Sequence, residues 1–431
     1  MAAAQGSDYA QFQLSEMLPV APDHWRYLWD GRRSSIDPQH HSYPAPSIPA
    51  LPHGYKLETA ADRLSRDGGS LDAFIREVTA LLDRNYVEDD DGFYRFSLSE
   101  TFVRFIFLAP DHDPNLFFSV VHDDGCSPER IVAFMAAVPI NLRVDPLRTL
   151  AISNFGSELL QWAFVDLACV EKSHRGKRLC PFLYDTIARQ CSTVRGIERL
   201  ICTSGYVLPT PVMSSNYYHR LNPRCLDFLC EIEFTSKPRK LTMESWIKLE
   251  ERTMCKKSAS DLSIRALSSN DISIVRAAYN SFVSTRFAVA RVFDTDADFA
   301  HMFHHGGGVI RSFVGVSSTP CDFISFYICE NQVIKPDHPL QGSKLRTAYC
   351  FYYCAGSMTL ENLLNEAILL LFSHESEPIH VVNALCGIMG YSHTVLDSLL
   401  FRKGTGTLNY YVRNQLFNSA LRPEDMAWFT T

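Results

Sequence analysis

The sequence lacks several features by which a protein's class is usually recognised. Its 13 cysteines include no C-x-x-C pair and no Cys/His group with zinc-ligand spacing, which argues against a structural zinc site. The formal net charge of -7 argues against a general nucleic-acid binder, which would carry a basic excess. No apolar run approaches the ~20 residues that a membrane span needs. Neither a G-x-x-x-x-G-K-S/T loop nor a G-x-G-x-x-G fingerprint is present, so any phosphate site must be of another kind.

The N-terminal residues also lack the marks of a secretory leader. The stretch "MAAAQGSDYAQFQLSEMLPV" has neither a positively charged start nor an apolar segment. Cys169, Cys350 and Cys386 lie in apolar, strand-like runs, where a free thiol behaves as a small hydrophobic group. These features predict a reducing, cytoplasmic compartment. They imply no metal and no redox cofactor, and we expect a monomer that binds no nucleic acid.

The composition predicts a globular chain of two or three domains, with 46% hydrophobic and 21% charged residues over 431 positions. Residues 31–54 are rich in Pro, Ser and His, and "HWRYLWDG" directly precedes them, so we expect residues 1–54 to be a flexible segment with an aromatic anchor. Two halves follow, 55–240 and 241–431, with a polar linker at 253–262 inside the second.

Both halves alternate between helix-like and strand-like patterns. In the first, "SLDAFIREVTALLDRNYV" (70–87) predicts a helix with a Ser-Leu-Asp start that can cap it. Strands are predicted over 93–98, 115–123, 130–144, 163–171 and 198–208, and a second helix over 179–192. In the other half, helices are predicted over 268–285 and 359–374, and strands over 307–316, 321–330, 346–357 and 379–388. The similar order suggests an internal duplication, although many α/β chains look repetitive at this coarseness.

One stretch carries a chemical signal. In "FVDLACVEKSHRGKRLCPFL" (164–183), an apolar strand runs into a basic, glycine-containing turn that opens a helix. The unpaired N–H groups of a first helical turn favour an anion, and a glycine lets the backbone approach it closely. GNAT-like acyltransferases hold the pyrophosphate of an acyl-CoA in this way. Read alone, the same stretch is also typical of a solvated helix start.

Several blocks in fixed order resemble one family, the glycylpeptide N-myristoyltransferases. "FVDLACVEK" (164–172) falls on the family signature E-I/V-N-F-L-C-x-H-K, and "FRKGTGTLNYYVRN" (401–414) falls on F-G-x-G-D-G-x-L-x-Y-Y-x-Y-N. Further blocks resemble the family at "YLWD" (27–30), "RNYVEDDDGFYRF" (84–96), "TSGYVLPTP" (203–211), "YYHRLNP" (217–223), "SFY" (325–327), "AYCFYY" (348–353) and "VNAL" (382–385). The resemblance covers roughly residues 24–431.

The resemblance implies an α/β (α+β) fold of two GNAT-like acyltransferase halves related by a pseudo-twofold, with a mixed sheet and flanking helices. It implies transfer of myristate from myristoyl-CoA to the N-terminal glycine of proteins. The oxyanion hole of the family is carried over to the backbone N–H groups of Leu167 and Ala168, which suits aminolysis of a thioester. The base of the family is the C-terminal carboxylate, here that of Thr431, with Thr203 and Asp166 beside it.

Two sets of binding residues are carried over in the same way. The N-terminal half is expected to bind myristoyl-CoA, together with Trp29 of the segment before it, through Lys172, Arg175, Gly176, Lys177, Arg178, Leu179, Cys180 and Pro181. The C-terminal half is expected to supply much of the groove for the substrate peptide. The groove residues are Val87, Glu88, Asp89, Asp90, Phe93, Tyr217, His219, Asn383, Thr405 and Gly406.

The sequence departs from the family pattern at functional positions. Asp166 replaces the signature Asn, Glu171 replaces the signature His, and Thr405 replaces the acid of G-D-G. Arg402 and Arg413 replace a Gly and a Tyr of the second signature. Two hypotheses follow: an active N-myristoyltransferase with a shifted peptide preference, or a catalytically weak paralogue that binds acyl-CoA or N-terminal-glycine peptides.

Overall fold

The computed structural model describes residues 50–66, 68–123, 125, 129–146, 159–208, 211–252, 254, 262–316, 321–373, 377–415, 417 and 419–430. No helix within these ranges is long and apolar enough to cross a membrane. The cysteines in the same ranges are free thiols. The expected flexible segment 1–54 lies almost wholly outside the described residues.

Strands form one mixed sheet in the described part of the chain. They are β1 (Tyr55–Thr59), β2 (Tyr94–Ser97), β3 (Phe117–His122), β4 (Arg130–Val144), β5 (Leu159–Val170), β6 (Arg199–Ser204), β7 (Met213–Leu221), β8 (Ile264–Ala266), β9 (Val289–Arg291), β10 (Ile310–Gly315), β11 (Phe323–Val333), β12 (Lys344–Cys354), β13 (Val381–Leu385), β14 (Arg402–Arg413) and β15 (Met426–Ala427). The α-helices are α3 (Ala60–Leu64), α4 (Leu71–Asn85), α5 (Glu100–Phe107), α6 (Leu179–Arg195), α7 (Leu226–Glu231), α8 (Met243–Glu251), α9 (Ile272–Arg286), α10 (Asp296–Phe303), α11 (Leu360–Phe372) and α12 (His393–Ser398). Short 3-10 turns include η3 (Lys172–His174), η4 (Pro223–Cys225) and η8 (Pro423–Asp425).

The strand order contains the same arrangement twice. The main path reads β1-β3-β4-β5-β6-β14-β7-β13-β12-β11-β10-β8. From either end inward, three antiparallel pairs are followed by one parallel pair and one antiparallel pair. The helices repeat in the same way. In the first half α4 follows β1 and α6 joins β5 to β6, and in the second α9 follows β8 and α11 joins β12 to β13. The predicted duplication is therefore confirmed at the level of topology, with the pseudo-twofold axis between β7 and β14.

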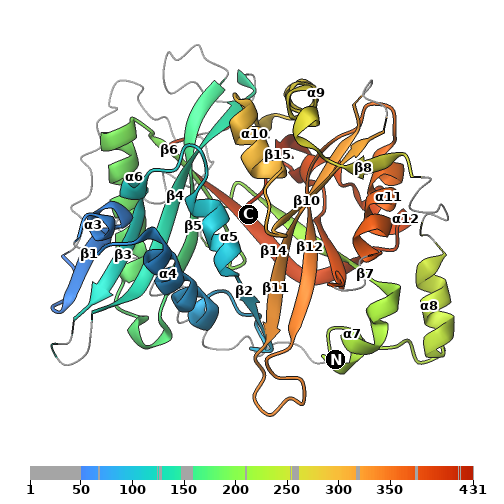
Figure 1. The fold of residues 1–431 in the computed structure, drawn as a ribbon, viewed down its shortest axis with the longest axis horizontal. Coiled ribbons are helices and arrows are strands. Elements are labelled where there is room, and N and C mark those ends of the chain that lie inside the picture. The colour runs from blue at the N-terminus through green and yellow to red at the C-terminus, as the bar shows by residue number, and fades with distance from the viewer. Residues whose placement is uncertain are drawn as a thin grey trace.

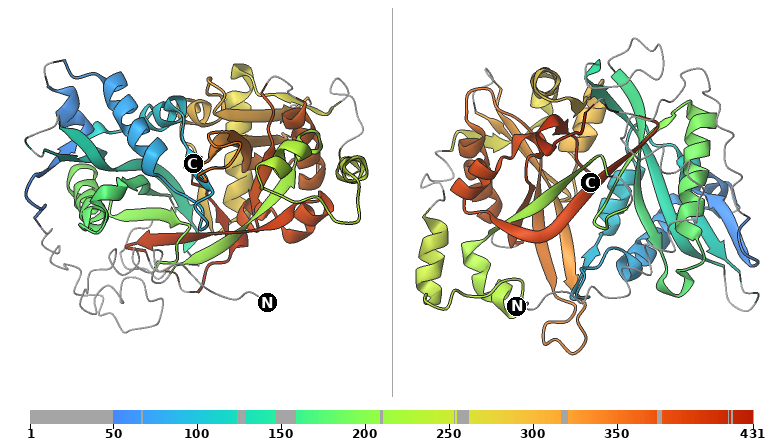
Figure 2. Two further views of the ribbon diagram at one scale, coloured as in Figure 1. Left: turned by 90° about the horizontal axis from the view of Figure 1, so that it is seen from below. Right: turned by 180° about the vertical axis from the view of Figure 1, so that it is seen from behind.

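The two central strands are exchanged between the halves. β7 comes from the N-terminal part of the chain but pairs with β13, whereas β14 comes from the C-terminal part and pairs with β6. Figure 1 shows the N-terminal elements in blue to green on one side and the later elements in yellow to orange on the other. In the view from behind in Figure 2, β14 (red) and β7 (green) run together across the middle. The exchange ties the halves into one sheet.

Strand β4 illustrates how the pattern produces the core. Its residues are buried on both faces: Phe134 belongs to the cluster under α4 and α5, and Met135 to the cluster under α6. A strand covered on both sides reads as a continuous apolar run, as "RIVAFMAAVPI" does. The predicted α/β class, a mixed sheet with flanking helices, is confirmed. The boundary at 240/241 stays a prediction.

Candidate active site

Strands β5 and β6 run parallel and then separate. Their pairing extends to Phe164 with Ile201. Beyond that point β5 remains paired with β4 on its other edge, and β6 remains paired with β14 on its other edge. We call the opening between the diverging ends of β5 and β6 the wedge. Backbone groups on the wedge side of β5 have no ladder partner there among the described strands, so they are available to a ligand.

Strand β5 carries a bulge at the wedge. Phe134 of β4 pairs with Cys169, and Ala136 pairs with Asp166, so Leu167 and Ala168 together face one residue of β4. Leu167 has φ +54°, a left-handed conformation that a side-chain-bearing residue keeps only where its surroundings impose it. A bulge leaves the extra residue outside the ladder. The predicted oxyanion donors therefore lie on irregular backbone at the wedge.

Asp166 precedes this bulge and contacts it. Its Oδ1 accepts the Leu167 N–H at 2.8 Å. The residue as a whole is partly buried, but its Oδ2 atom is fully buried and has no hydrogen-bond partner among the described residues. Burial raises the pKa of the Asp166 carboxyl to about 7, although the Leu167 bond opposes the shift. The Leu167 N–H, one of the two predicted oxyanion donors, is thus already hydrogen-bonded to the Asp166 side chain.

The last described residues are anchored beside the wedge. Trp428 is fully buried, and its ring packs edge-on against Phe164 and Tyr410, with centroids 5.1 and 5.7 Å apart. The Phe429 N–H donates to the Tyr352 hydroxyl at 3.1 Å. Figure 1 marks this end of the chain near the middle of the molecule.

Thr203 lies opposite Tyr410 in the β6–β14 ladder, so it shares this region with Trp428. The predicted base Thr431 lies outside the described residues. Residues 426–429, which precede it, are buried and therefore do not fray.

The basic turn forms as predicted at the start of α6. Gly176 has φ +80° and Arg178, the N-cap, has φ +60°, so two successive kinks bend the chain from η3 into the helix. The N-cap residue makes no side-chain cap hydrogen bond. The N–H groups of Leu179 and Cys180 therefore have no cap from Arg178 and can face an anion, and Pro181 has no N–H to satisfy.

The cations of this turn have separate contacts. The Arg175 guanidinium donates to the Val170 and Asn85 carbonyls, so it holds the turn against α4. Lys177 Nζ donates to the Tyr55 hydroxyl at 2.5 Å and lies over that ring. Lys172 Nζ donates to Glu88 at 2.7 Å. Trp29, also predicted to contact the acyl-CoA, lies outside the described residues.

The acidic loop after α4 is tied to the same turn. Glu88 bonds both Lys172 and Arg95. Partial burial would raise the pKa of Glu88, but these two hydrogen bonds outweigh it and hold the pKa below its usual value. Asp89 Oδ1 accepts the N–H groups of Phe93 and Tyr94 and so closes the loop. Val87 and Asp90 are exposed. Of the three predicted carboxylates, Glu88 and Asp89 already have structural partners.

A second bulge lies where β14 meets β7. Lys403 pairs with Tyr218 and Thr407 with Asn216, so Gly404, Thr405 and Gly406 together face Tyr217. A Cβ on Gly404 would overlap the His219 ring, and one on Gly406 would lie 3.3 Å from the Tyr217 ring. The glycines therefore allow two predicted groove side chains to lie against the backbone.

His219 is fixed by a predicted partner. Its Nδ1 lies 2.5 Å from Asn383 Oδ1. Burial lowers the pKa of His219, although the Asn383 bond opposes the shift, so the neutral ring donates Nδ1–H to that oxygen. Its Nε2 then remains an acceptor.

Aromatic side chains connect the two bulges, and all of them except Tyr217 were missed by the sequence analysis. Tyr86, at the end of α4, lies within electrostatic range of Asp166. Ring contacts lead from Tyr86 to Phe96, Tyr349 and Tyr217, with centroids 6.2 to 6.3 Å apart at each step. The strand patterns around Phe96 and Tyr349 predict burial but not convergence, because the ring contacts join different helices and strands.

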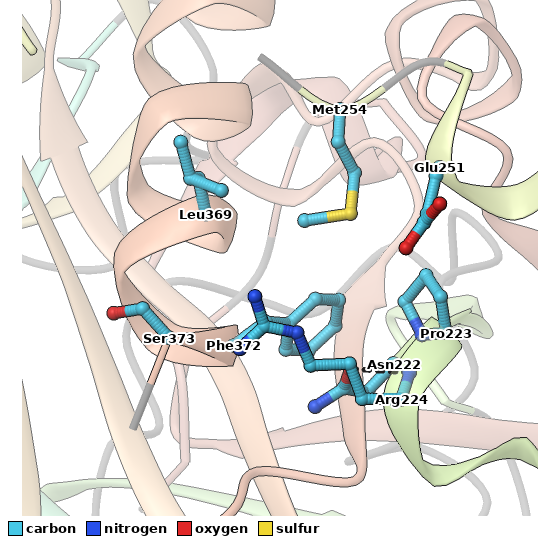
Figure 3. Close-up of a pocket in the computed structure, with 8 residues that line it drawn as sticks. All are labelled: Asn222, Pro223, Arg224, Glu251, Met254, Leu369, Phe372 and Ser373. Atoms are coloured by element: carbon cyan, nitrogen blue, oxygen red, sulfur yellow. Dashed lines mark hydrogen bonds between the residues drawn. The ribbon is translucent and has the colours of Figure 1, made fainter. Parts of the chain in front are cut away.

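A cavity of about 210 Å³ lies elsewhere, between η4, α8 and α11 (Figure 3). Its lining residues are Asn222, Pro223, Arg224, Glu251, Met254, Leu369, Phe372 and Ser373. None of them is a predicted site residue. The predicted residues that the structure describes lie instead at the wedge, the basic turn, the acidic loop and the β14 bulge.

Comparisons with known proteins agree with this arrangement. The family "Myristoyl-CoA:protein N-myristoyltransferase" matches twice, through its N-terminal domain at residues 68–215 and its C-terminal domain at residues 231–426. A probable glycylpeptide N-tetradecanoyltransferase of Caenorhabditis elegans is 31% identical over 79% of this chain and 70% of its own length. Glycylpeptide N-tetradecanoyltransferase 2 of Bos taurus is 31% identical over 85% of this chain and 66% of its own length.

A solved structure agrees at the level of the fold. Saccharomyces cerevisiae N-myristoyltransferase with bound myristoyl-CoA superposes with a TM-score of 0.70 at 24% identity, over 90% of this chain and 89% of that one. Two family domains match in order, and a relative is 31% identical in sequence. Such sequence similarity is stronger evidence of common family membership than a shared fold alone. The chain therefore belongs to the myristoyl-CoA:protein N-myristoyltransferase family of acyltransferases.

Proposed function

We propose that this protein transfers myristate from myristoyl-CoA to the N-terminal glycine amine of proteins. The observation that carries the proposal is the bulge at Leu167 and Ala168, which lies at the wedge directly before the basic turn. An acyl-CoA with its pyrophosphate at the turn would extend its thioester toward this bulge. Family membership makes glycine-initiated peptides the acceptor class.

The proposed reaction is direct aminolysis. The glycine nitrogen bonds to the thioester carbon, and negative charge develops on the former carbonyl oxygen. The Leu167 and Ala168 N–H groups would stabilise this oxyanion. The C–S bond then breaks, the amide forms, and CoA leaves as a thiolate that takes up a proton.

The acyl-CoA would be held mainly by the α6 terminus. The Leu179 and Cys180 N–H groups are free for phosphate oxygens, and Gly176 lets the backbone approach them. Lys177 would exchange its Tyr55 contact for a phosphate. Arg175 would brace the turn through Nε and Nη2, which bond main-chain carbonyls, beside its predicted contact with the acyl-CoA.

The proposed base is the Thr431 carboxylate. In water, proton transfer from an α-ammonium to such a carboxyl is uphill by about 4.5 pKa units, or about 6 kcal/mol. Burial narrows the difference, because it raises a carboxyl pKa and lowers an ammonium pKa. The buried Trp428 and Phe429 beside the wedge support an enclosed terminus near Thr203.

The proposed peptide groove differs in charge from the family pattern. Glu88 is neutralised by Lys172 and Arg95, and Thr405 stands in place of an acid. Asp90 is exposed, so it would remain accessible to a lysine of the peptide. We infer a weaker preference for basic peptides than the family pattern implies. The cytoplasmic location and the monomeric state remain predictions.

The alternative is a catalytically weak protein that binds acyl-CoA or glycine-initiated peptides. The hydrogen bond from the Leu167 N–H to Asp166 favours it, since an engaged donor cannot serve an oxyanion fully.

Adding one residue after Thr431 tests the proposal against this alternative. Myristoyl transfer to a Gly-x-x-x-Ser-Lys peptide should stop, because the α-carboxylate is displaced, whereas myristoyl-CoA binding should persist. Transfer that survives the extension would refute Thr431 as the base. An unextended protein that binds myristoyl-CoA without transferring it would support the alternative.

A further inference from the structure

The contact between Asp166 and its neighbour has a consequence for the reaction. The Leu167 N–H points at Asp166 Oδ1, 2.8 Å away, within a bulge whose left-handed φ fixes the direction of that N–H. A carboxylate that accepts this bond places a full negative charge beside the position where the oxyanion would form. The second oxygen, Oδ2, is buried without a partner among the described residues, so that charge is poorly compensated.

Among the described residues, the titratable groups within electrostatic range of Asp166 carry no compensating charge. Tyr86 at the end of α4, Cys202 on β6 and Cys329 on β11 lie within electrostatic range. Burial raises the pKa of the Cys202 thiol to about 12, and it raises the pKa values of Tyr86 and Cys329 well above their usual ranges. All three are therefore neutral near neutral pH.

We propose that Asp166 is a positioning residue whose charge state controls the oxyanion hole, an inference that rests on the proposed function. Ionised Asp166 holds the Leu167 N–H and repels the oxyanion. Neutral Asp166 accepts this hydrogen bond more weakly, so its side chain can move aside and leave the N–H to the thioester oxygen. An amide side chain at this position is neutral at every pH and leaves the donor available throughout.

Burial raises the pKa of Asp166 to about 7, so the balance between the two states shifts within an accessible range. At pH 8 about one molecule in eleven would carry neutral Asp166, and at pH 6 about ten in eleven. Asp166→Asn should therefore raise kcat about tenfold at pH 8 and about twofold at pH 7, with little change at pH 6.

The test compares the kcat and KM of the full-length protein, Asp166→Asn and Asp111→Asn from pH 6 to pH 8.5. Asp111 is exposed in a turn and serves as a control for loss of one carboxylate. The expected result is a kcat ratio that rises with pH for Asp166→Asn only, with an unchanged KM for myristoyl-CoA. A ratio at or below one at every pH would overturn the proposal.

A second readout does not require turnover. The amide resonance of Leu167 should titrate near pH 7 in the wild-type protein and should not move in Asp166→Asn. A Leu167 resonance that is independent of pH would overturn the control by Asp166, whatever the rates. If neither protein transfers myristate at any pH, the proposed function fails, and the resonance alone decides whether Asp166 controls the donor.

Discussion

Replacing Asp166 by Asn should remove a pH-dependent loss of stability. In the folded protein, burial raises the pKa of this carboxyl from 3.8 to about 7. The unfolded chain ionises it at the ordinary value, so above about pH 4 the folded state retains a proton that the unfolded state has released. The free energy of unfolding therefore falls as pH rises from about 4, and it levels off above about pH 7.

The magnitude follows from the two pKa values. One pKa unit corresponds to about 1.4 kcal/mol, so the group lowers the free energy of unfolding by about 1.7 kcal/mol at pH 5. At pH 8 the same group lowers it by about 4 kcal/mol. Between these two pH values the wild-type protein should lose about 2.5 kcal/mol that Asp166→Asn keeps.

Urea unfolding at pH 5 and pH 8 measures this difference. Asp271→Asn is the matched control, because hydrogen bonds from Arg265 hold the pKa of Asp271 well below its usual range. Asp271 is ionised at both pH values, so its replacement should lower the free energy of unfolding equally at both. An identical pH dependence in the wild-type protein and Asp166→Asn would refute the burial of the Asp166 carboxyl.

Three further predictions concern the groove, the chain end and the basic turn. Gly404→Ala should displace the His219 ring and raise the peptide KM at least tenfold without weakening myristoyl-CoA binding, and an unchanged KM in steady-state kinetics would contradict the contact. Trp428→Ala should lower the free energy of unfolding by about 3 to 5 kcal/mol and reduce kcat. Unfolding titrations measure the loss of stability. Full activity at reduced stability would mean that Trp428 anchors the chain end without contributing to catalysis. Lys177→Ala should weaken myristoyl-CoA binding about tenfold in calorimetry. Equal affinity would mean that Lys177 stays on Tyr55.

Much of the fold could be predicted because its strands and helices have strong local patterns. The run over 130–144 became β4 with the predicted bounds, and the helix predicted over 70–87 became α4. β7 and β14 were not predicted as strands. Their sequences contain Ser, Asn, Gly and Thr, which have weak strand patterns. Pairing on both sides at the centre of the sheet stabilises them, and local sequence does not reveal such pairing.

The candidate site could be predicted only as a set of residue types. The family signature identified Leu167 and Ala168, but a pattern of letters does not specify a bulge or a left-handed φ. The Asp166 side chain could have many partners, and the structure shows its bond to the next backbone N–H. Arg175 was predicted as a ligand for the acyl-CoA, and that role stays a prediction, but the sequence could not show that its Nε and Nη2 bond main-chain carbonyls.

Transfer of myristate to a glycine amine is the central claim, and release of CoA from myristoyl-CoA tests it most directly. The assay uses a Gly-x-x-x-Ser-Lys peptide and a matched peptide in which Ala replaces the first Gly. We predict CoA release that requires the glycine peptide, with myristate found on its N-terminal nitrogen. Binding of myristoyl-CoA without CoA release across varied glycine-initiated peptides would contradict the account.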